Sequence, residues 1–404
     1  MRAVWPEAPI AEVCQVNPRL GDLKTPSPET LVSFVPMAAI DEQRGAIAST
    51  ETRAYSEVAK NYSSFRDGDV LFARITPCMQ NGKAAIARNL CGGIGFGSTE
   101  FHVLRHSKSV LPEWVFAFVR QPSFRSRAEA SFTGTAGQQR VPADLFNETK
   151  IPVPPLPEQE RIVHILDAAE ELRRLRAQAD RRTADLIPAL FSDMFGDPAT
   201  NPKQWPMVPV SSFVEELVGG RNVNPAGGEN GSSRYRVLKI SAVTWGRFRP
   251  QESKPIAPDY EPPESHIVQR GDLLFSRANT TELVGATAYV FETPPNLLLP
   301  DKLWRFVWNQ PTGVEPFYVW CLFQTATVRR ELGRRATGTG GSMKNISKPK
   351  VLSLVVPTPP LPLQRQFAAR VQEIRALEAR QAESRRRLDD LFQSLLHRAF
   401  QGER

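Results

Sequence analysis

The chain repeats itself once, and this duplication limits its fold more than any other feature of the sequence. The run GDVLFAR at Gly68 to Arg74 returns as GDLLFSR at Gly271 to Arg277, 203 positions later. Three further pairs keep the same order: Trp5-Pro6 with Trp205-Pro206, Thr133-Gly134-Thr135 with Thr337-Gly338-Thr339, and Pro154-Pro155-Leu156-Pro157 with Pro359-Pro360-Leu361-Pro362. A repeat of about 200 residues is far longer than a solenoid repeat, so each copy should contain a whole domain and a connector.

Each copy changes character along its length. Its first part is rich in β-branched and aromatic residues interrupted by Gly, Pro and Asn, and we expect short strands there, for example at 69–75, 101–105 and 235–243. After a Pro-rich stretch comes a segment without glycine, made mostly of Ala, Leu, Arg, Glu and Gln, at 158–195 and again at 363–400. These residues are strong helix formers, so the sequence predicts a long helix after each domain.

Apolar residues recur in these two segments at the spacing of seven that is typical of paired helices. The expected contact positions are Ile165, Leu172, Leu175, Ala179 and Leu186 in the first segment and Ile374, Leu377, Gln381, Leu388, Leu391 and Leu395 in the second. Each helix could pack on its own domain, but their equivalent places and similar lengths favour an antiparallel pair. We expect Pro188 to kink or restart the first helix, because proline lacks the backbone donor and clashes with the preceding turn.

The sequence therefore predicts an α+β fold, with two homologous mixed α/β domains separated by a pair of long antiparallel, coiled-coil-like helices. The expected parts are a first domain at 1–155, a central helix and spacer at 156–200, a second domain at 201–360 and a C-terminal helix at 361–404.

The charge of the chain favours a polyanionic partner. There are 51 Lys and Arg against 43 Asp and Glu, a formal net charge of +8, although ribosomal, membrane-surface and metabolic proteins can be equally basic. The 4 cysteines have no metal-ligand spacing, so neither a zinc site nor a disulfide framework is expected. No segment approaches the ~20 apolar residues of a membrane helix, and the N-terminus lacks a signal-peptide pattern, so we expect a soluble cytoplasmic protein that does not enter membranes.

The groups that an enzyme needs occur singly in this chain but not in a catalytic arrangement. The glycine spacings of nucleotide-binding loops are absent, and we expect Gly92 to Gly97 to form a loop before a strand. The 5 histidines have no Ser or Cys partner arrangement, and no AdoMet-type glycine motif accompanies an amino-methyltransferase tetrad. The chain should therefore contain no catalytic residue, no metal and no cofactor of its own.

Basic and polar residues lie near the ends of the predicted strands, where loops commonly carry function. Arg74 and Arg277 end the repeated strand, and each either pairs with a neighbouring carboxylate or contacts DNA. Asn81 and Lys83 lie in a tight turn, which is either an ordinary hairpin or a phosphate contact. Asn279 begins the corresponding polar turn of the second copy.

Two glycine-containing loops complete the candidate DNA-binding set. They contribute Thr133, Thr135, Gln138, Gln139 and Arg140 in the first copy and Thr337, Thr339, Ser342, Lys344 and Asn345 in the second. Such side chains hydrogen-bond base edges and phosphates, and because they differ between the copies, the two domains should read different sequences. The alternative is a pair of solvent loops without a ligand.

The ordered motifs resemble those of specificity subunits of type I restriction-modification systems. The first half contains DGDVLFARITPCMQNGKAAIA, GIGFGSTEFHVLR, SFTGTAGQQRV and KIPVPPLPEQERIV. The second half repeats the series as QRGDLLFSRANTTELVGATAYV, LLLPDKLWRFV, RATGTGGSMKNIS and PTPPLPLQRQF. Between the halves stands LFSDMFGDPATNPKQWP, which is similar to the central junction of that family.

The resemblance implies two target-recognition domains that bind double-stranded DNA, each reading one half of a bipartite target, and helices that set the unread spacer. It also implies two methyltransferase subunits docked on the helices, restriction subunits that join them, and AdoMet, ATP and magnesium supplied by these partners. The alternatives are a coiled-coil scaffold whose β-rich domains bind protein or RNA, and an orphan specificity subunit of another defence system.

Overall fold

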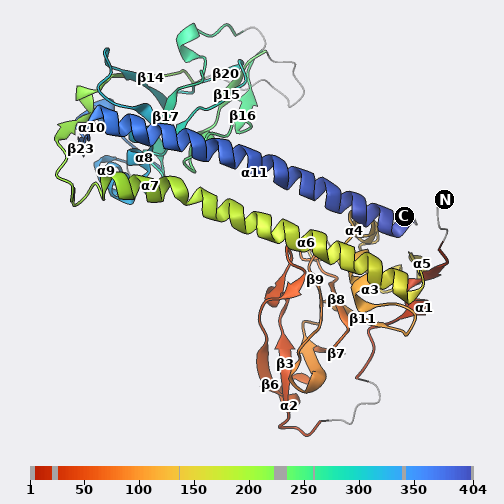
Figure 1. Cartoon of the computed structure of the whole chain (residues 1–404). Helices are drawn as coiled ribbons and strands as arrows, with labels where there is room; N and C mark the ends of the chain where they lie inside the picture. Colours follow the sequence, from red (N-terminus) through yellow and green to blue (C-terminus); the bar gives the residue numbers. More distant parts are fainter. Residues whose placement is uncertain are drawn as a thin grey trace. The chain divides into compact units, whose positions relative to one another are not determined.

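The computed structural model describes residues 5–20, 26–135, 137–222, 234–257, 260–338 and 343–401. The chain divides into two compact units. The first unit contains Met1–Ala177 together with Glu383–Arg404, and the second contains Gln178–Ala382. Each unit therefore combines the sheets of one half of the chain with parts of two long helices (Figure 1). The expected α+β class is confirmed.

The first unit contains these elements. Its strands are β1 (Glu7–Pro9), β2 (Cys14–Val16), β3 (Leu31–Val35), β4 (Ile40–Asp41), β5 (Ala46–Ile47), β6 (Glu51–Ala54), β7 (Ser63–Arg66), β8 (Val70–Ala73), β9 (Ala84–Ile86), β10 (Ile94–Gly97), β11 (Phe101–His106) and β12 (Lys150–Pro152). Its helices are α1 (Ile10–Val13), α2 (Tyr55–Val58), α3 (Pro112–Val119), α4 (Pro122–Ala130), α5 (Leu145–Glu148) and most of α6 (Leu156–Ala184).

The second unit contains the following elements. Its strands are β13 (Met207–Pro209), β14 (Val214–Gly219), β15 (Arg236–Leu238), β16 (Ser253–Pro255), β17 (Leu273–Ser276), β18 (Ala278–Asn279), β19 (Thr287–Tyr289), β20 (Leu297–Leu298), β21 (Leu303–Trp308), β22 (Lys344–Asn345) and β23 (Val355–Pro357). Its helices are α7 (Leu186–Phe195), α8 (Pro316–Gln324), α9 (Ala326–Arg335), α10 (Lys348–Leu352) and the first part of α11 (Leu361–Gln401), whose last part belongs to the first unit.

Both units are built on the same antiparallel four-stranded sheet. The strand order is β2-β11-β8-β9 in the first unit and β14-β21-β17-β19 in the second. The repeated motif supplies β8 and β17, and both strands are buried along their whole length. Helix α3 packs against β8, β9 and β11. The duplication predicted from the sequence is thus present as two copies of one topology.

A further sheet in each unit contains a parallel pair. β3 pairs parallel with β10 and antiparallel with β6, while β15 pairs parallel with β20 and antiparallel with β16. The loop expected at Gly92 to Gly97 was wrong, because β10 occupies most of it. A Cβ on Gly95 would lie 2.2 Å from the Phe65 ring, so this glycine serves close packing within the sheet. The strand expected at 235–243 is short, since a 3-10 helix, Ile240–Ala242, follows β15.

The aspartate of the repeated motif has a structural role. Asp69 accepts hydrogen bonds from Nε and Nη2 of Arg105 at 2.9 and 2.7 Å, and both side chains are buried. In the second unit, Asp272 lies 3.1 Å from Nε of Arg305. Arg105 is the fifth residue of β11 and Arg305 the third of β21, so both project from the same face of equivalent strands. Removing one partner would leave a buried charge uncompensated, at a cost of about 3–5 kcal/mol.

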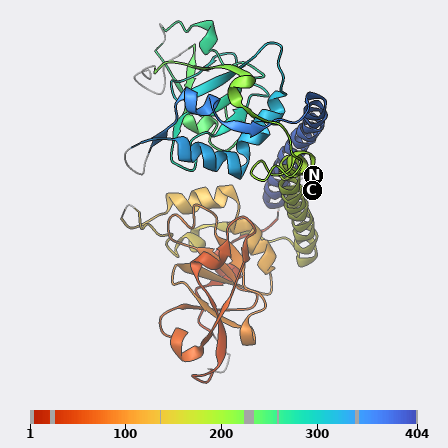
Figure 2. The same ribbon diagram turned by 90° about the vertical axis from the view of Figure 1, so that its left-hand side faces the viewer.

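Helices α6 and α11 run antiparallel within each unit (Figures 1 and 2). In the first unit, Ile162 of α6 shares a core with Ala399 of α11, whereas the later residue Arg173 binds the earlier residue Asp389, with Nε 2.8 Å from Oδ1. In the second unit, Nε2 of Gln381 donates to Oγ1 of Thr183 at 3.0 Å.

The face of α6 that packs is not the one predicted. Ile165, Leu172 and Leu175 of α6 and Leu186 of α7 are 37–52% exposed, so these four predicted contact positions were wrong, whereas the predicted position Ala179 is half-buried. The covered positions are Ile162, Leu166, Ala169, Arg173, Thr183 and Ile187. This face includes two polar residues, Arg173 and Thr183, whose partners lie on α11. The spacing of leucines in α6 therefore does not identify the packed face. On α11, Ile374, Leu377, Gln381, Leu388 and Leu395 are half-buried as expected, but Leu391 is exposed.

The interruption expected at Pro188 is confirmed. α6 ends at Ala184 and α7 begins at Leu186. Because the ring of a proline clashes with the carbonyl four residues earlier, Pro188 prevents the turn at Ala184 from continuing. The restarted helix places Phe195 against Tyr318, with ring centroids 4.8 Å apart.

Each long helix begins with a completely buried glutamine. Oε1 of Gln159 accepts from the backbone N–H of Leu111 at 2.9 Å, and its Nε2 donates to the carbonyl of Pro154 at 2.8 Å. Gln364 repeats this arrangement with the N–H of Glu315 at 2.8 Å and the carbonyl of Pro359 at 2.7 Å. Both glutamines come two residues after the repeated Pro-Pro-Leu-Pro motif, and their role is not evident from the sequence. They fix the start of each helix to its domain.

None of the helices in the described part of the chain combines the length and the apolar character that a membrane crossing requires.

Candidate nucleic-acid interface

In the first unit, the candidate residues gather beyond the end of β8. The hairpin 133–140 is closed by backbone hydrogen bonds between Thr133 and Arg140, at 3.0 and 2.9 Å. Thr76 ties this hairpin to the chain that follows β8, because its N–H donates to the carbonyl of Gln139 at 3.0 Å and its hydroxyl accepts from the N–H of Gln139 at 3.2 Å. The exposed candidates of the hairpin are Thr133, Thr135 and Gln138.

One carboxylate orients two arginines at this edge. Glu100 accepts from Nε and Nη2 of Arg140 at 2.9 and 2.8 Å and lies 3.4 Å from Nε of Arg74. The hydrogen bond from Arg140, together with the charges of both arginines, lowers the pKa of Glu100. Both arginine side chains remain about one third exposed, at 36% and 35%. A single carboxylate leaves this cluster with net positive charge, which suits a phosphate.

The turn that contains Lys83 is different. Its ammonium group lies 2.9 Å from the carbonyl oxygen of Ile40, 3.3 Å from that of Met37 and 3.4 Å from Oε2 of Glu42. A phosphate would have to displace these partners, so the contacts favour a structural role for Lys83. Asn81, on the same turn, is exposed, and its side chain has no hydrogen-bond partner among the described residues.

The second unit repeats this edge with other side chains. β18 pairs with β22, so that Ala278 faces Asn345 and Asn279 faces Lys344, and Thr337 forms a bridge with Asn345. The first unit has the matching bridges from Arg140 to Ile75 and to Thr133. Asn345 therefore takes the place of Arg140, and Lys344 that of Gln139. The candidates Thr339 and Ser342 lie outside the described residues.

Arg277 also has a carboxylate partner. Its Nε donates to the carbonyl of Asp301 at 2.8 Å, and its Nη2 lies 3.4 Å from Oδ2 of the same residue. Nearby, Nζ of Lys344 donates to the carbonyl of Gly338 at 3.1 Å. Oδ1 of Asn279 accepts from the N–H of Thr280, and Thr337 and Asn345 are exposed. The structure thus brings Arg277, Asn279, Thr337, Lys344 and Asn345 to one edge.

The carboxylates that orient these arginines were not predicted from the sequence. Glu100 comes immediately before β11, and Asp301 comes two residues before β21. An acidic residue just ahead of the same strand in both copies was the available signal. The pairing of β11 with β8 and of β21 with β17 brings this acidic residue next to the arginine. A local sequence pattern does not reveal that pairing.

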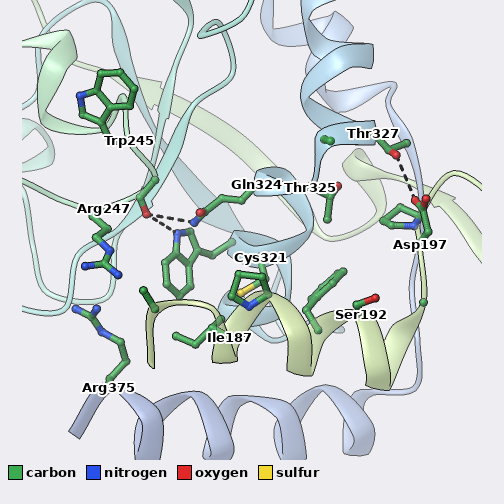
Figure 3. A pocket seen from close by; sticks show the side chains of 18 of the residues that line it. Ile187, Ser192, Asp197, Trp245, Arg247, Cys321, Gln324, Thr325, Thr327 and Arg375 are labelled. Carbon is green, nitrogen blue, oxygen red and sulfur yellow. Dashed lines mark hydrogen bonds between the residues drawn. The ribbon is translucent and has the colours of Figure 1, made fainter. Parts of the chain in front are cut away.

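The second unit also has a cavity of about 420 Å³ between α7, α8 and the turn at Gly246 (Figure 3). Nε1 of Trp320 and Nε2 of Gln324 both donate to the carbonyl of Gly246, at 3.3 and 3.2 Å. Cys321 lines this cavity, and burial raises the pKa of its thiol. The thiol therefore stays protonated at neutral pH and is a poor nucleophile.

Known proteins match both the sequence and the fold. The family model described as the type I restriction modification DNA specificity domain matches residues 4–179. The specificity subunit of type I restriction enzyme EcoEI from Escherichia coli is 27% identical over 91% of this chain and 77% of its own length. That of EcoKI, from E. coli strain K12, is 29% identical over 74% of this chain and 67% of its own.

A solved chain from a study of assembly and conformational transition in the type I restriction-modification system supports the fold. It covers 99% of this chain and 98% of its own length, with 23% identity and a TM-score of 0.63. The sequence matches and the duplicated sheet topology agree with the resemblance seen in the repeated motifs. Over most of its length the chain is thus similar to specificity subunits of type I restriction-modification systems, and residues 4–179 match their DNA specificity domain.

Proposed function

We propose that this chain selects the DNA sequence on which a type I restriction-modification complex acts. Each domain, 1–155 and 201–360, reads one half of a bipartite target in double-stranded DNA. The chain contributes recognition and no catalysis. Methyltransferase and restriction subunits carry out methylation and cleavage and bring AdoMet, ATP and magnesium.

The observation that carries this proposal is the pair of equivalent edges with different side chains. The same backbone pairing presents Gln139 and Arg140 in the first unit and Lys344 and Asn345 in the second. Gln and Asn bind adenine and Lys binds guanine through their hydrogen-bonding groups, whereas Arg140 is held by Glu100. Two edges with the same geometry but different donors and acceptors suit two different half-sites.

Phosphate contacts would hold each domain on the duplex. Arg74 and Arg140 share one carboxylate, and Arg277 has Asp301, so these guanidinium groups are held in place before DNA arrives. Oriented cations lose less side-chain entropy on binding than free ones. We assign them to positioning the domains and assign the exposed polar residues of the hairpins to base reading.

Helices α6 and α11 would set the spacer and dock the methyltransferase subunits. The exposed stripe of α6 supports the docking role. Ile165, Leu172 and Leu175 lie on one face at helical spacing, and they are 37%, 52% and 45% exposed. Exposed apolar side chains at coiled-coil spacing suit an amphipathic helix from a partner subunit.

The test is a pair of matched double variants in the hairpins. In cells with the cognate methyltransferase, Gln138→Ala with Gln139→Ala should relax the methylated motif in one half-site only, each lost base contact costing about 1–3 kcal/mol. Lys344→Ala with Asn345→Ala should relax the other half. Long-read sequencing of modified bases measures both motifs. Relaxation of both halves by either variant, or of neither by both, would contradict the assignment.

A further inference from the structure

The second unit carries an arginine-rich helix next to its proposed reading edge. Helix α9 has the sequence ATVRRELGRR and buries Val328 and Leu332 against the sheet. Arg330 is exposed and has no hydrogen bond or ion pair with any described residue. Arg334, one turn later, is 73% exposed, and its Nη1 lies 3.9 Å from Oε2 of Glu331. Residues four apart lie on one helix face, so these two guanidinium groups form a basic stripe.

Helix α9 is held tightly against the reading edge. Nη2 of Arg329 donates to the carbonyl of Glu282 at 2.8 Å, and a Cβ on Gly333 would lie 2.8 Å from the carbonyl oxygen of Thr281. Both carbonyls belong to the turn that follows β18, and β18 pairs with β22. Arg335, the last residue of α9, is two residues before Thr337. The arginine stripe and the reading edge therefore belong to one continuous part of the second unit.

The equivalent helix of the first unit lacks the stripe. α4 makes the same kind of contact, since Nη2 of Arg125 binds the carbonyl of Gln80 in the corresponding turn. The buried residues Phe124 and Ala128 match Val328 and Leu332. The positions that match Arg330 and Arg334 are then the exposed residues Ser126 and Ala130. The arginine that binds the turn, Arg125 or Arg329, occurs in both copies. The exposed pair of arginines occurs only in the second copy.

We propose that Arg330 and Arg334 bind backbone phosphates of the DNA beside the half-site of the second domain. The inference rests on the proposed function and goes beyond it, because it makes the two domains unequal. Each domain has an arginine at the end of the repeated strand, Arg74 or Arg277, but the first adds Arg140 of its hairpin and the second adds α9. The ligand is the phosphodiester backbone, so this contact contributes affinity and salt dependence without reading bases.

The experiment measures how binding of duplex DNA depends on salt. The wild-type complex with its methyltransferase and the variant Arg330→Ala with Arg334→Ala are titrated with a duplex that contains the methylated target, at several NaCl concentrations. Two lost phosphate contacts should lower the slope of log affinity against log salt by about 1.8. The preference for target over scrambled DNA should not change. The control variant Arg330→Lys with Arg334→Lys keeps the charges and should keep most of the slope.

The first unit offers the reciprocal test. Ser126→Arg with Ala130→Arg transplants the stripe onto α4 and should raise the slope. An unchanged slope in the alanine variant overturns the proposal, as does a relaxed base preference in one half-site, since the arginines would then read bases. If the wild-type complex itself shows no preference for its target, the proposed function fails and this inference falls with it.

Discussion

Gln364 joins the second domain to its helix through two backbone groups. Gln364→Leu would leave the N–H of Glu315 and the carbonyl of Pro359 without these partners, at a cost of about 1–3 kcal/mol for each buried group. We expect the second unit to unfold at lower urea concentration. The control is Gln366→Leu, the same change at an exposed position of the same helix. Equal midpoints for the two variants would show that the buried amide does not fix the joint.

Glu100 makes the first hairpin sensitive to acid. Because Arg140 lowers the pKa of Glu100, the ion pair stabilises the folded hairpin above the ordinary glutamate pKa of about 4.3 and is lost as pH falls through the lowered value. Glu100→Gln imitates the protonated state. At neutral pH it should speed hydrogen exchange of the amides of Thr133 and Arg140. Glu148→Gln, at an exposed position, should not; identical exchange in both variants would remove Glu100 from this role.

At this scale, the sequence identified candidate residues better than their partners. Arg74 and Arg277 were predicted to meet either a carboxylate or DNA, and the carboxylates are present in Glu100 and Asp301. Lys83 was expected at a turn, and its contacts with the backbone of Met37 and Ile40 come from a distant segment. Such partners depend on tertiary approach, which a pattern along the chain does not contain.

The exposed stripe of α6 gives a prediction at the scale of a single helix. Leu172→Gln with Leu175→Gln changes two side chains that are about half exposed, so the unfolding midpoint should stay the same. Copurification of the methyltransferase subunit should fall strongly, since apolar contact area with the partner is lost. Glu171→Gln with Arg174→Gln alters an exposed ion pair of the same helix and serves as the control. Undiminished copurification would place the docking surface elsewhere.

Helix positions followed from composition, but the packed face did not. Long runs of strong helix formers predicted α6, α7 and α11, and Pro188 predicted the interruption. α6 carries two stripes with heptad spacing, one through Leu172 and one through Leu166. Arg173 and Thr183 belong to the buried stripe, where Asp389 and Gln381 satisfy them. Contacts with α11 determine which of the two stripes is buried. The sequence of α6 alone favours the stripe with more leucines.

For the whole molecule, the proposed spacer role predicts a change in the target itself. In the sequence, Ala179 of α6 lies between Arg173 and Thr183, and Ser384 of α11 lies between their partners Gln381 and Asp389. Seven helical residues inserted after both positions add about 10 Å, or about three base pairs at 3.4 Å each. The methylated motif should keep both half-sites and gain that spacer. Insertions of four residues turn the helix further from its register and should be tolerated less well.

Long-read sequencing of cells with each insertion variant measures the spacer. An active variant with an unchanged spacer would show that the helices support the domains without setting their separation.

Each unit completes its core with a helix end from the other half of the chain. Phe400 of α11 packs on Trp114, with centroids 4.3 Å apart, and Phe195 of α7 packs on Tyr318 at 4.8 Å. Trp114 and Tyr318 occupy matching places, since they donate to the carbonyls of Pro152 and Pro357 in equivalent strands. A shortened chain of residues 1–200 therefore carries, in Phe195, the ring that a second copy of itself needs in place of Phe400. Two such chains could exchange helix ends as a symmetric homodimer and read one half-site twice, as a palindrome. A bipartite target with two different half-sites would then result from sequence divergence between the two copies. The same fold would serve a palindromic target and a bipartite one.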